Sequence, residues 1–371
     1  MKTAHLMFGI PRRNRWPWRT AFGVLLTAFL PAATAHADAT GPGWHTQPTE
    51  AYAKKRDDIV FLDARNGFYG TGKGRLFRTT DGGHSWTLAW EHPGTFIRSL
   101  GFIDATRGFL GNLGAGLAGT TDPVPLYRTS DGGRTWQAVQ LGSGSMTGVC
   151  AIDILKARAI VEGEVRDRIL VHAAGRANGP AQLLRSEDGG ESWQVFDLSD
   201  RAGMILDVKF LDPDTGFVFA GTSSDVRQSS ALILSTHDGG RTWREVYRSS
   251  RRQEIIWKAS FASARIAYAT LQSDDDSNSQ QRFLKSTDAG AHWRELPLVR
   301  NPKAQEFGIG FVGARHGWIG TAAGGFETTN GGKDWNASSL APKANKIRTR
   351  AVDGTSMIYA IGTEVQIYGP G

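Results

Sequence analysis

A seven-residue phrase occurs six times along the chain and limits the folds that the chain can adopt. Its clearest copy is SDGGRTW at residues 130–136, and each copy runs from an Asp or Asn through glycine to a Trp. Successive copies lie 50, 57, 50, 50 and 42 residues apart, a period typical of four-stranded units rather than of helical repeats. The Asp or Asn and the Trp of each copy are Asp81 and Trp86, Asp131 and Trp136, Asp188 and Trp193, Asp238 and Trp243, Asp288 and Trp293, and Asn330 and Trp335.

A second phrase precedes most copies and has the pattern of two strands joined by a tight turn. FLDARNGFYG at 61–70 and FIDATRGFLG at 102–111 are examples, with apolar residues alternating along each half. This phrase is followed by a third short strand, the glycine turn and a fourth strand that begins at the Trp. One unit is therefore an antiparallel meander of strands A to D, and repetition of such units around an axis gives a β-propeller.

The two ends of the chain supply one further unit between them. Residues 347–369 provide strands A, B and C, and the segment 43–50 carries Trp44 where a strand D would have its Trp. We predict an all-β, seven-bladed β-propeller of four-stranded antiparallel blades, whose last blade is closed by the N-terminal strand. This closure would hide two open strand edges. Residues 38–371 would form one domain, with roughly 48 residues per blade.

The repeated phrase itself is explained by turn chemistry. A Ser or Thr lies two residues before each Asp or Asn. An Asp at a tight turn accepts hydrogen bonds from the N–H groups that follow it, and glycine permits positive φ where the chain reverses. The Trp ring would cover the turn between neighbouring blades. We therefore interpret the six copies as structural parts and not as ligand sites.

The first 37 residues have the pattern of a signal peptide. A basic start precedes the apolar run AFGVLLTAFL at 21–30, which is too short for a permanent anchor, and Ala35-His36-Ala37 fits a cleavage site. We expect an exported, periplasmic or secreted protein that does not span a membrane after cleavage behind Ala37. Arg12-Arg13 leaves the twin-arginine route open beside the general one.

Charge and cysteine content exclude several classes of function. The predicted leader contains five of the 43 Lys and Arg, so 38 basic residues face 36 acidic ones in the rest. A nucleic-acid-binding protein is therefore not expected. Cys150 is the only cysteine, which excludes an internal disulfide and a cysteine metal cluster. We expect no metal, no cofactor and a monomer.

The phrase resembles the Asp-box, or BNR repeat, of sialidases, sortilin-type receptors and related propellers. Six copies, with F-x-D-x-x-x-G-F between them, most resemble the photosystem II stability and assembly factor family and its relatives in non-photosynthetic bacteria. The resemblance covers residues 43–371. It implies an exported, cofactor-free scaffold that binds other proteins and that assists the assembly of a membrane complex in photosynthetic organisms.

Asp-box propellers also include glycosidases, so a sialidase-like hydrolase or a carbohydrate-binding lectin is the alternative. The sialidase resemblance would require an F-R-I-P stretch before the first box, and the nearest string, TFIRSL at 95–100, follows that box and lacks the proline. Xyloglucanase-like enzymes use two propellers, whereas this chain has one. A lectin would need exposed aromatic residues, for which Trp90 and Trp257 are the candidates. Asp207 and Glu306 are the channel-mouth acids that a hydrolase would use.

Binding is expected opposite the boxes, on the side of the B–C and D–A loops. Basic residues gather in the D–A loops and favour an acidic partner: Arg201, Arg251, Arg252, Arg300, Lys303, Lys343, Lys346 and Arg348. Long B–C loops are predicted at 112–125, 172–180, 222–230 and 272–281. The last contains Asp274, Asp275 and Asp276, which would either hold a cation or be solvated.

Strand alternation places a further set toward the central channel as its polar lining: Asp58, Asp207, Lys209, Lys258, Arg348 and Arg350.

Overall fold

The computed structural model describes residues 41–142, 146–161, 164–352 and 354–370. The predicted leader, residues 1–37, lies outside the described residues. Residues 40–371 form one compact unit. The described part contains 28 strands and one short 3-10 helix, η1 (Val226–Gln228). None of its helices is long and apolar enough to cross a membrane.

The strands form seven antiparallel sheets of four strands each, named here blades 1 to 7. Blade 1 contains β2 (Ile59–Phe61), β3 (Gly67–Gly70), β4 (Arg75–Thr79) and β5 (Thr87–Glu91). Blade 2 contains β6 (Ile97–Phe102), β7 (Gly108–Asn112), β8 (Leu126–Thr129) and β9 (Gln137–Ala138). Blade 3 contains β10 (Ala151–Val161), β11 (Glu164–Gly175), β12 (Gln182–Ser186) and β13 (Gln194–Asp197). Blade 4 contains β14 (Met204–Phe210), β15 (Gly216–Gly221), β16 (Ala231–Thr236) and β17 (Arg244–Arg248).

The remaining three blades follow the same order. Blade 5 contains β18 (Glu254–Phe261), β19 (Ala267–Ser273), β20 (Gln280–Ser286) and β21 (Arg294–Arg300). Blade 6 contains β22 (Glu306–Val312), β23 (His316–Thr321), β24 (Gly324–Thr328) and β25 (Asn336–Ser338). Blade 7 contains β26 (Lys346–Val352), β27 (Thr355–Ile361), β28 (Val365–Gly369) and β1 (Gly43–Thr46). The predicted number of sheets and their antiparallel order are confirmed.

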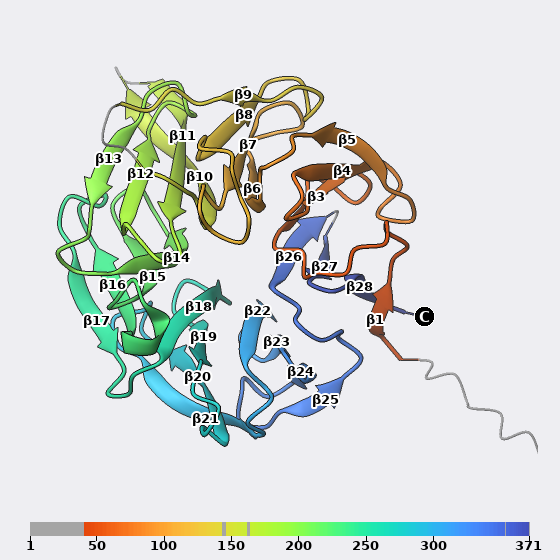
Figure 1. Ribbon diagram of the computed structural model, residues 1–371, viewed down its shortest axis with the longest axis vertical. Coiled ribbons are helices and arrows are strands. Elements are labelled where there is room, and N and C mark those ends of the chain that lie inside the picture. Colours follow the sequence, from red (N-terminus) through yellow and green to blue (C-terminus); the bar gives the residue numbers. More distant parts are fainter. Residues whose placement is uncertain (1–40, 143–145, 162–163, 353, 371) are drawn as a thin grey trace, which may run out of the picture. The chain divides into compact units, whose positions relative to one another are not determined.

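The seven blades form a closed ring (Figure 1). The first strand of each blade contacts the first strand of the next, and β26 of blade 7 contacts β2 of blade 1. The N-terminal strand β1 pairs antiparallel with β28, with Trp44 opposite Tyr368. The chain thus joins its two ends within one sheet, and this is the arrangement of strands in a β-propeller.

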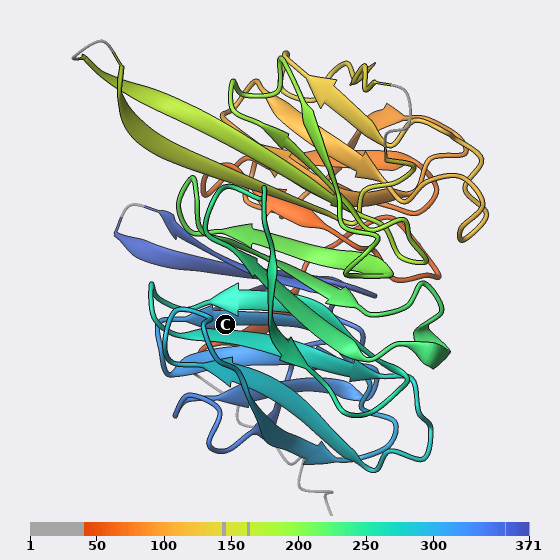
Figure 2. The same ribbon diagram turned by 90° about the vertical axis from the view of Figure 1, so that its left-hand side faces the viewer.

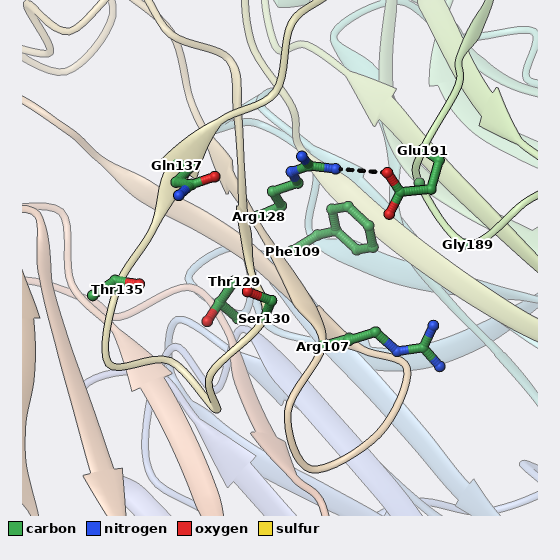
Figure 3. Close-up of a pocket in the computed structure, with 10 residues that line it drawn as sticks. Arg107, Phe109, Arg128, Thr129, Ser130, Thr135, Gln137, Gly189 and Glu191 are labelled. Atoms are coloured by element: carbon green, nitrogen blue, oxygen red, sulfur yellow. Dashed lines mark hydrogen bonds and ion pairs between the residues drawn. The ribbon is translucent and has the colours of Figure 1, made fainter.

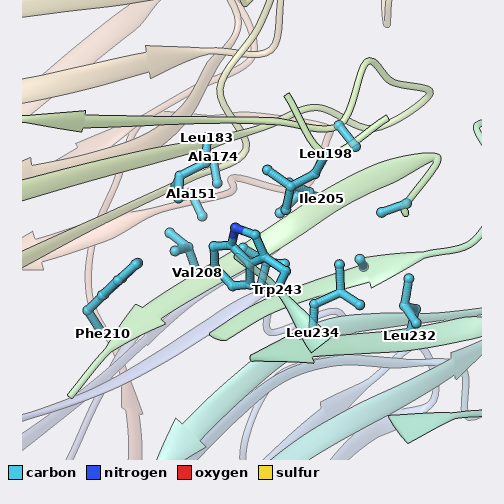
Figure 4. Packing of buried hydrophobic residues seen from close by; sticks show 14 residues of the cluster. Ala151, Ala174, Leu183, Leu198, Ile205, Val208, Phe210, Leu232, Leu234 and Trp243 are labelled. Carbon is cyan, nitrogen blue, oxygen red and sulfur yellow. The ribbon is translucent and has the colours of Figure 1, made fainter. Parts of the chain in front are cut away.

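Blades are held together by apolar side chains between neighbouring sheets. Figure 4 shows the cluster between blades 3 and 4, where Trp243 packs among Leu183, Val208 and Leu234. The indole Nε1–H of Trp243 donates to the carbonyl of Gly240 at 2.9 Å. The second strand of a blade is covered on both faces, which explains why β15 reads GFVFAG and is buried throughout.

The repeated turns have one geometry, illustrated by the box of blade 3. The hydroxyl of Ser186 donates to Asp188 at 2.7 Å. Asp188 also accepts from the backbone N–H of Ser192 at 3.0 Å and from its hydroxyl at 2.6 Å. Gly190 follows with a φ of +98°, and a Cβ there would come within 2.2 Å of the Phe109 ring in blade 2. Glycine is therefore needed both for the turn and for contact with the neighbouring blade.

Because of these turns, the stability of the folded protein decreases at acidic pH. The Thr135 hydroxyl and backbone N–H lower the pKa of Asp131 to about 2. At Asp188 slight burial acts in the opposite direction, but hydrogen bonds from Ser192 and Ser186 lower the pKa to about 2. The pKa of an Asp in the unfolded chain is about 3.9. Between about pH 4 and pH 2 the unfolded chain therefore binds more protons than the folded one, and the free energy of unfolding decreases.

We therefore expect the free energy of unfolding to lose the contribution of these carboxylates as the pH falls through this window. Urea unfolding at pH 5 and pH 3, followed by tryptophan fluorescence, measures the loss. The Asp188→Asn variant keeps one acceptor oxygen but does not titrate, so its loss should be smaller than that of the wild type. An identical loss in both proteins would contradict this account of the turn.

Blade 3 differs from the prediction in its first hairpin. Strands β10 and β11 contain 11 and 12 residues and project beyond the other sheets (Figure 2). At its other end β11 continues to Gly175, so the predicted loop 172–180 begins with strand residues and the connection to β12 is shorter. Likewise, the predicted loop 272–281 narrows to 274–279 because β19 and β20 extend into it. The strand residues within both predicted loops are small or polar although they are buried, among them His172, Ala173, Gln272 and Ser273, so their sequence resembles that of a loop.

Candidate binding site in the ring

Ion pairs between blades line the interior of the ring. Nη2 of Arg348 in β26 lies 2.9 Å from both carboxylate oxygens of Asp58, which directly precedes β2. Nζ of Lys209 in β14 donates to Asp153 in β10 at 2.8 Å. The pattern predicted that Asp58, Lys209 and Arg348 line the channel but did not include Asp153, and the structure shows that the four side chains form direct pairs there. Each pair connects the inner edges of two blades.

A third cluster places one carboxylate between two lysines. Nζ of Lys258 in β18 and Nζ of Lys346 in β26 each lie 3.6 Å from Asp207 in β14. Lys258 also donates to the carbonyl of Leu206 at 2.7 Å. Burial lowers the pKa of Lys258 to about 7, although the Asp207 carboxylate acts in the opposite direction. The two lysines in turn hold the pKa of Asp207 below its ordinary value against the effect of burial.

A plug of side chains closes the ring on the side of the D–A loops. The buried Asp57 forms ion pairs with Lys55 and with Arg98 of blade 2. The Arg98 guanidinium lies 4.9 Å from the ring centroid of Trp257 in blade 5, and Trp257 donates to Asn345 at 2.9 Å. Side chains from blades 1, 2 and 5 and from the loop before blade 7 thus meet across the ring. Sequence reasoning missed Asp57, Arg98 and Asn345, since nothing in their local patterns marks them.

An apolar cluster covers this plug from the loop side. Leu113 and Leu117 of the long loop in blade 2, and Val226 of η1 in blade 4, pack with the buried Cys150 and Leu206. The long B–C loops of blades 2 and 4 therefore fold inward with these apolar residues and cover the end of the channel.

A cavity of about 360 Å³ remains on the other side of the plug. It lies between the first strands of six blades, beside the ion pairs described above. The lining side chains of Lys346 and Arg348 are 16% and 24% exposed, whereas Arg350 is exposed. The cavity therefore opens toward the A–B turns and the Asp-box turns.

The structure divides the predicted basic residues of the D–A loops into two groups. Arg251 pairs with Glu254 and with Glu295, Lys346 and Arg348 lie inside the ring, and Arg201 lies 3.6 Å from Asp200. The other four are exposed and make no ion pair within the described residues: Arg252, Arg300, Lys303 and Lys343. We name these four the basic sector, because they lie at the end of β21 (Arg300) or in the loops that lead into blades 5, 6 and 7.

The structure also shows the environment of the residues that were predicted for a hydrolase or a lectin. Glu306 is not at the channel mouth as predicted, because it is fully buried, and no described residue forms a hydrogen bond with its carboxylate. Burial raises its pKa well above the ordinary value. Trp257 belongs to the plug, and Trp90 stacks on His92 at a centroid distance of 5.5 Å. Within the described residues, no three His, Cys, Asp or Glu side chains are placed to hold a metal ion.

A smaller crevice lies between the Asp-box turns of blades 2 and 3 (Figure 3). It measures about 150 Å³. Arg128 and Glu191 bridge it with an ion pair of 3.2 Å, and Phe109 forms its apolar wall. The crevice belongs to the packing of adjacent blades, and the central cavity is the larger candidate for a ligand.

Comparison with known proteins supports the architecture. The photosystem II assembly lipoprotein Ycf48 of Synechococcus sp. (strain CC9902) is 27% identical over 147 residues, 39% of this chain and 40% of that protein. The xyloglucanase Xgh74A of Acetivibrio thermocellus is 25% identical over 240 residues, 53% of this chain and 25% of that protein. The chain thus spans less than half the length of these curated relatives. No protein-family model matches it.

Solved structures give the fold. A structure of YCF48 bound to a D1 peptide matches with a TM-score of 0.62 at 17% identity, covering 90% of this chain and 96% of that one. The fold is a β-propeller. An ancestral GH74 enzyme matches with the same TM-score at 14% identity, covering 87% of this chain and 46% of the enzyme. Both likenesses concern the fold alone.

Proposed function

We propose that the chain is an exported, non-catalytic protein-binding scaffold, a single seven-bladed propeller of residues 38–371 that acts in the manner of Ycf48. The proposal rests on the YCF48 structure, because the match covers 90% of this chain and 96% of that structure. The GH74 enzyme is matched over only 46% of its chain. That YCF48 structure holds a peptide. By analogy, the partner of this chain is a protein, and we propose a component of a membrane complex under assembly.

The interior of the ring favours binding over hydrolysis. A glycosidase of the usual kind needs two carboxyl groups free to act on one sugar bond. Here Asp58, Asp153 and Asp207 all form ion pairs with basic side chains. Carboxylates that are paired with basic side chains in this way suit a stable lining better than the proton donor of a hydrolase.

The basic sector is the proposed docking surface for an acidic region of the partner. Its four side chains are exposed and keep their charge available, and complementary charge accelerates association and selects partners. Arg251 and Arg348, although predicted in the same set, are already neutralised by Glu254 and Asp58. They are therefore left unchanged in the test.

Capture of partners from detergent-solubilised host membranes tests the proposal. The tagged full chain is compared with Arg252→Glu/Lys303→Glu/Lys343→Glu, and we expect capture at low salt to fall about tenfold or more in the variant. Arg265→Glu/Arg315→Glu/Lys333→Glu is the matched control, with the same charge change in turns on the opposite face, and it should capture normally. Equal capture by all three proteins would exclude the basic sector. Xyloglucan hydrolysis that Asp207→Asn abolishes would favour an enzyme instead.

A further inference from the structure

The cavity in the ring has a single opening. Along β26 the exposure of alternate side chains decreases inward, from the exposed Arg350 to Arg348 at 24% and Lys346 at 16%. Deeper still, Asp57 and Arg98 of the plug are only 4% and 3% exposed. A molecule can therefore enter from the Asp-box side and reach as far as the plug. This side is opposite the D–A loops that carry the basic sector.

The walls of the cavity carry more positive than negative charge. Asp58 balances Arg348, and Asp153 balances Lys209. Asp207 alone faces both Lys258 and Lys346. This group of three therefore contains two lysines and one carboxylate.

Arg350 at the mouth is the cation without a partner. It makes no ion pair within the described residues. Burial raises the pKa of Asp63, but hydrogen bonds that its carboxylate accepts from the backbone of Asn66 and Arg65 in its own turn, both at 2.7 Å, and the more distant Arg350 lower it. Among the described residues that line the cavity, four are basic, Lys209, Lys346, Arg348 and Arg350, and two are acidic, Asp153 and Asp207.

The positive groups are arranged as a ladder on one strand. Lys346, Arg348 and Arg350 occupy alternate positions of β26, and alternate side chains of a strand point to the same side at a spacing of about 7 Å. All three line the cavity. Lys209 lines the same cavity from β14. An anionic group can therefore approach Arg350 first and Lys346 deeper inside.

We propose that this cavity is a binding site for a carboxylate-bearing ligand that enters from the Asp-box side. Its volume of about 360 Å³ lies at the lower end of the range for small-molecule sites, so it admits a small polycarboxylate or the C-terminal residues of a peptide. The site goes beyond the proposed scaffold function and uses none of the residues of the basic sector. The long β10–β11 hairpin and the β26–β27 hairpin project on the same side (Figure 2) and provide additional surface for a ligand that extends out of the cavity.

Titration calorimetry of the full chain at low ionic strength tests the site, with citrate as the small probe. We expect Arg350→Gln and Lys346→Gln each to weaken citrate binding about fivefold or more, and the double variant about thirtyfold. Neither residue is needed to neutralise a buried acid, because Arg350 makes no ion pair with any described residue and Lys258 still faces Asp207 in the Lys346 variant. The control Arg315→Gln removes an exposed cation elsewhere on the same side, one without an ion pair in the described part of the chain, and should bind as the wild type does.

A second probe distinguishes the source of the carboxylate. A labelled hexapeptide of glycine and alanine is measured by fluorescence anisotropy, once with a free C-terminus and once amidated. Binding of the free form alone, weakened by Arg350→Gln, assigns the site to chain termini. Citrate binding without peptide binding assigns it to small polycarboxylates. If neither probe binds, or if Arg350→Gln and Lys346→Gln leave binding unchanged, the proposal is overturned. The triple variant of the basic sector should bind citrate normally, which separates this result from that of the partner test.

Discussion

Replacing Asp57 with asparagine is expected to lower the free energy of unfolding by about 3–5 kcal/mol. Asp57 is buried and forms ion pairs with Lys55 and Arg98. Burial alone would raise its pKa, but these two cations lower it. The amide keeps the shape of the side chain, so the loss comes from two cations that remain at the plug without a counter-charge. Urea unfolding at neutral pH, followed by tryptophan fluorescence, measures it.

Asp276→Asn is the control for this experiment, since Asp276 is exposed in the loop between β19 and β20. Its effect should stay within about 0.5 kcal/mol. Adding Arg98→Met to Asp57→Asn should recover part of the loss, because an apolar side chain replaces one uncompensated charge. A loss below about 1 kcal/mol for Asp57→Asn would mean that water reaches the plug and that the ring is open at both ends.

Replacing Trp44 with alanine is expected to cost about 3–5 kcal/mol and to release the N-terminal strand. Trp44 is 5% exposed, and its ring lies edge-on to Trp318 at 5.5 Å and to Tyr368 at 5.4 Å. Strand β1 lies at the outer edge of blade 7 and pairs only with β28, so this aromatic cluster holds the closure. We expect early proteolytic cleavage between β1 and β2 in the variant, together with a lower midpoint of urea unfolding.

Leu88→Ala provides the comparison for this second prediction. Leu88 lies in β5, the outer strand of blade 1, and is 51% exposed, so its truncation should cost less than about 0.5 kcal/mol. If Trp44→Ala were as stable and as resistant to proteolysis as Leu88→Ala, the closure by β1 would contribute little to the ring.

The fold could be predicted because its determinants are local and repeated. A turn phrase such as SDGGRTW contains its own hydrogen-bond acceptor, its glycines and its Trp, and six copies fix the period of the strands. The prediction was less accurate in blade 3, where the F-x-D-x-x-x-G-F phrase is missing and the hairpin of β10 and β11 is longer. Without a marked turn, the sequence does not reveal where a strand ends.

The candidate site was predictable only in part, because it depends on partners far apart in the sequence. Alternation along β26 correctly placed Arg348 toward the channel, but its partner Asp58 lies 290 residues away. The plug of Asp57, Arg98 and Trp257 draws on three blades, and no pattern within one blade indicates it. For the same reason, Arg251 was expected to be free for a partner, although Glu295 in the outer strand of blade 5 already pairs with it.

Site-specific photo-crosslinking tests the scaffold function most directly. The photoreactive residue p-benzoylphenylalanine replaces either Lys303 in the basic sector or Arg315 on the Asp-box side, both exposed positions without ion pairs within the described residues. Irradiation of host membranes is predicted to join a defined partner protein to position 303, with little product at position 315. Crosslinks at position 315 alone would place the partner on the other face, and the absence of a protein adduct at both positions would contradict a protein-binding scaffold.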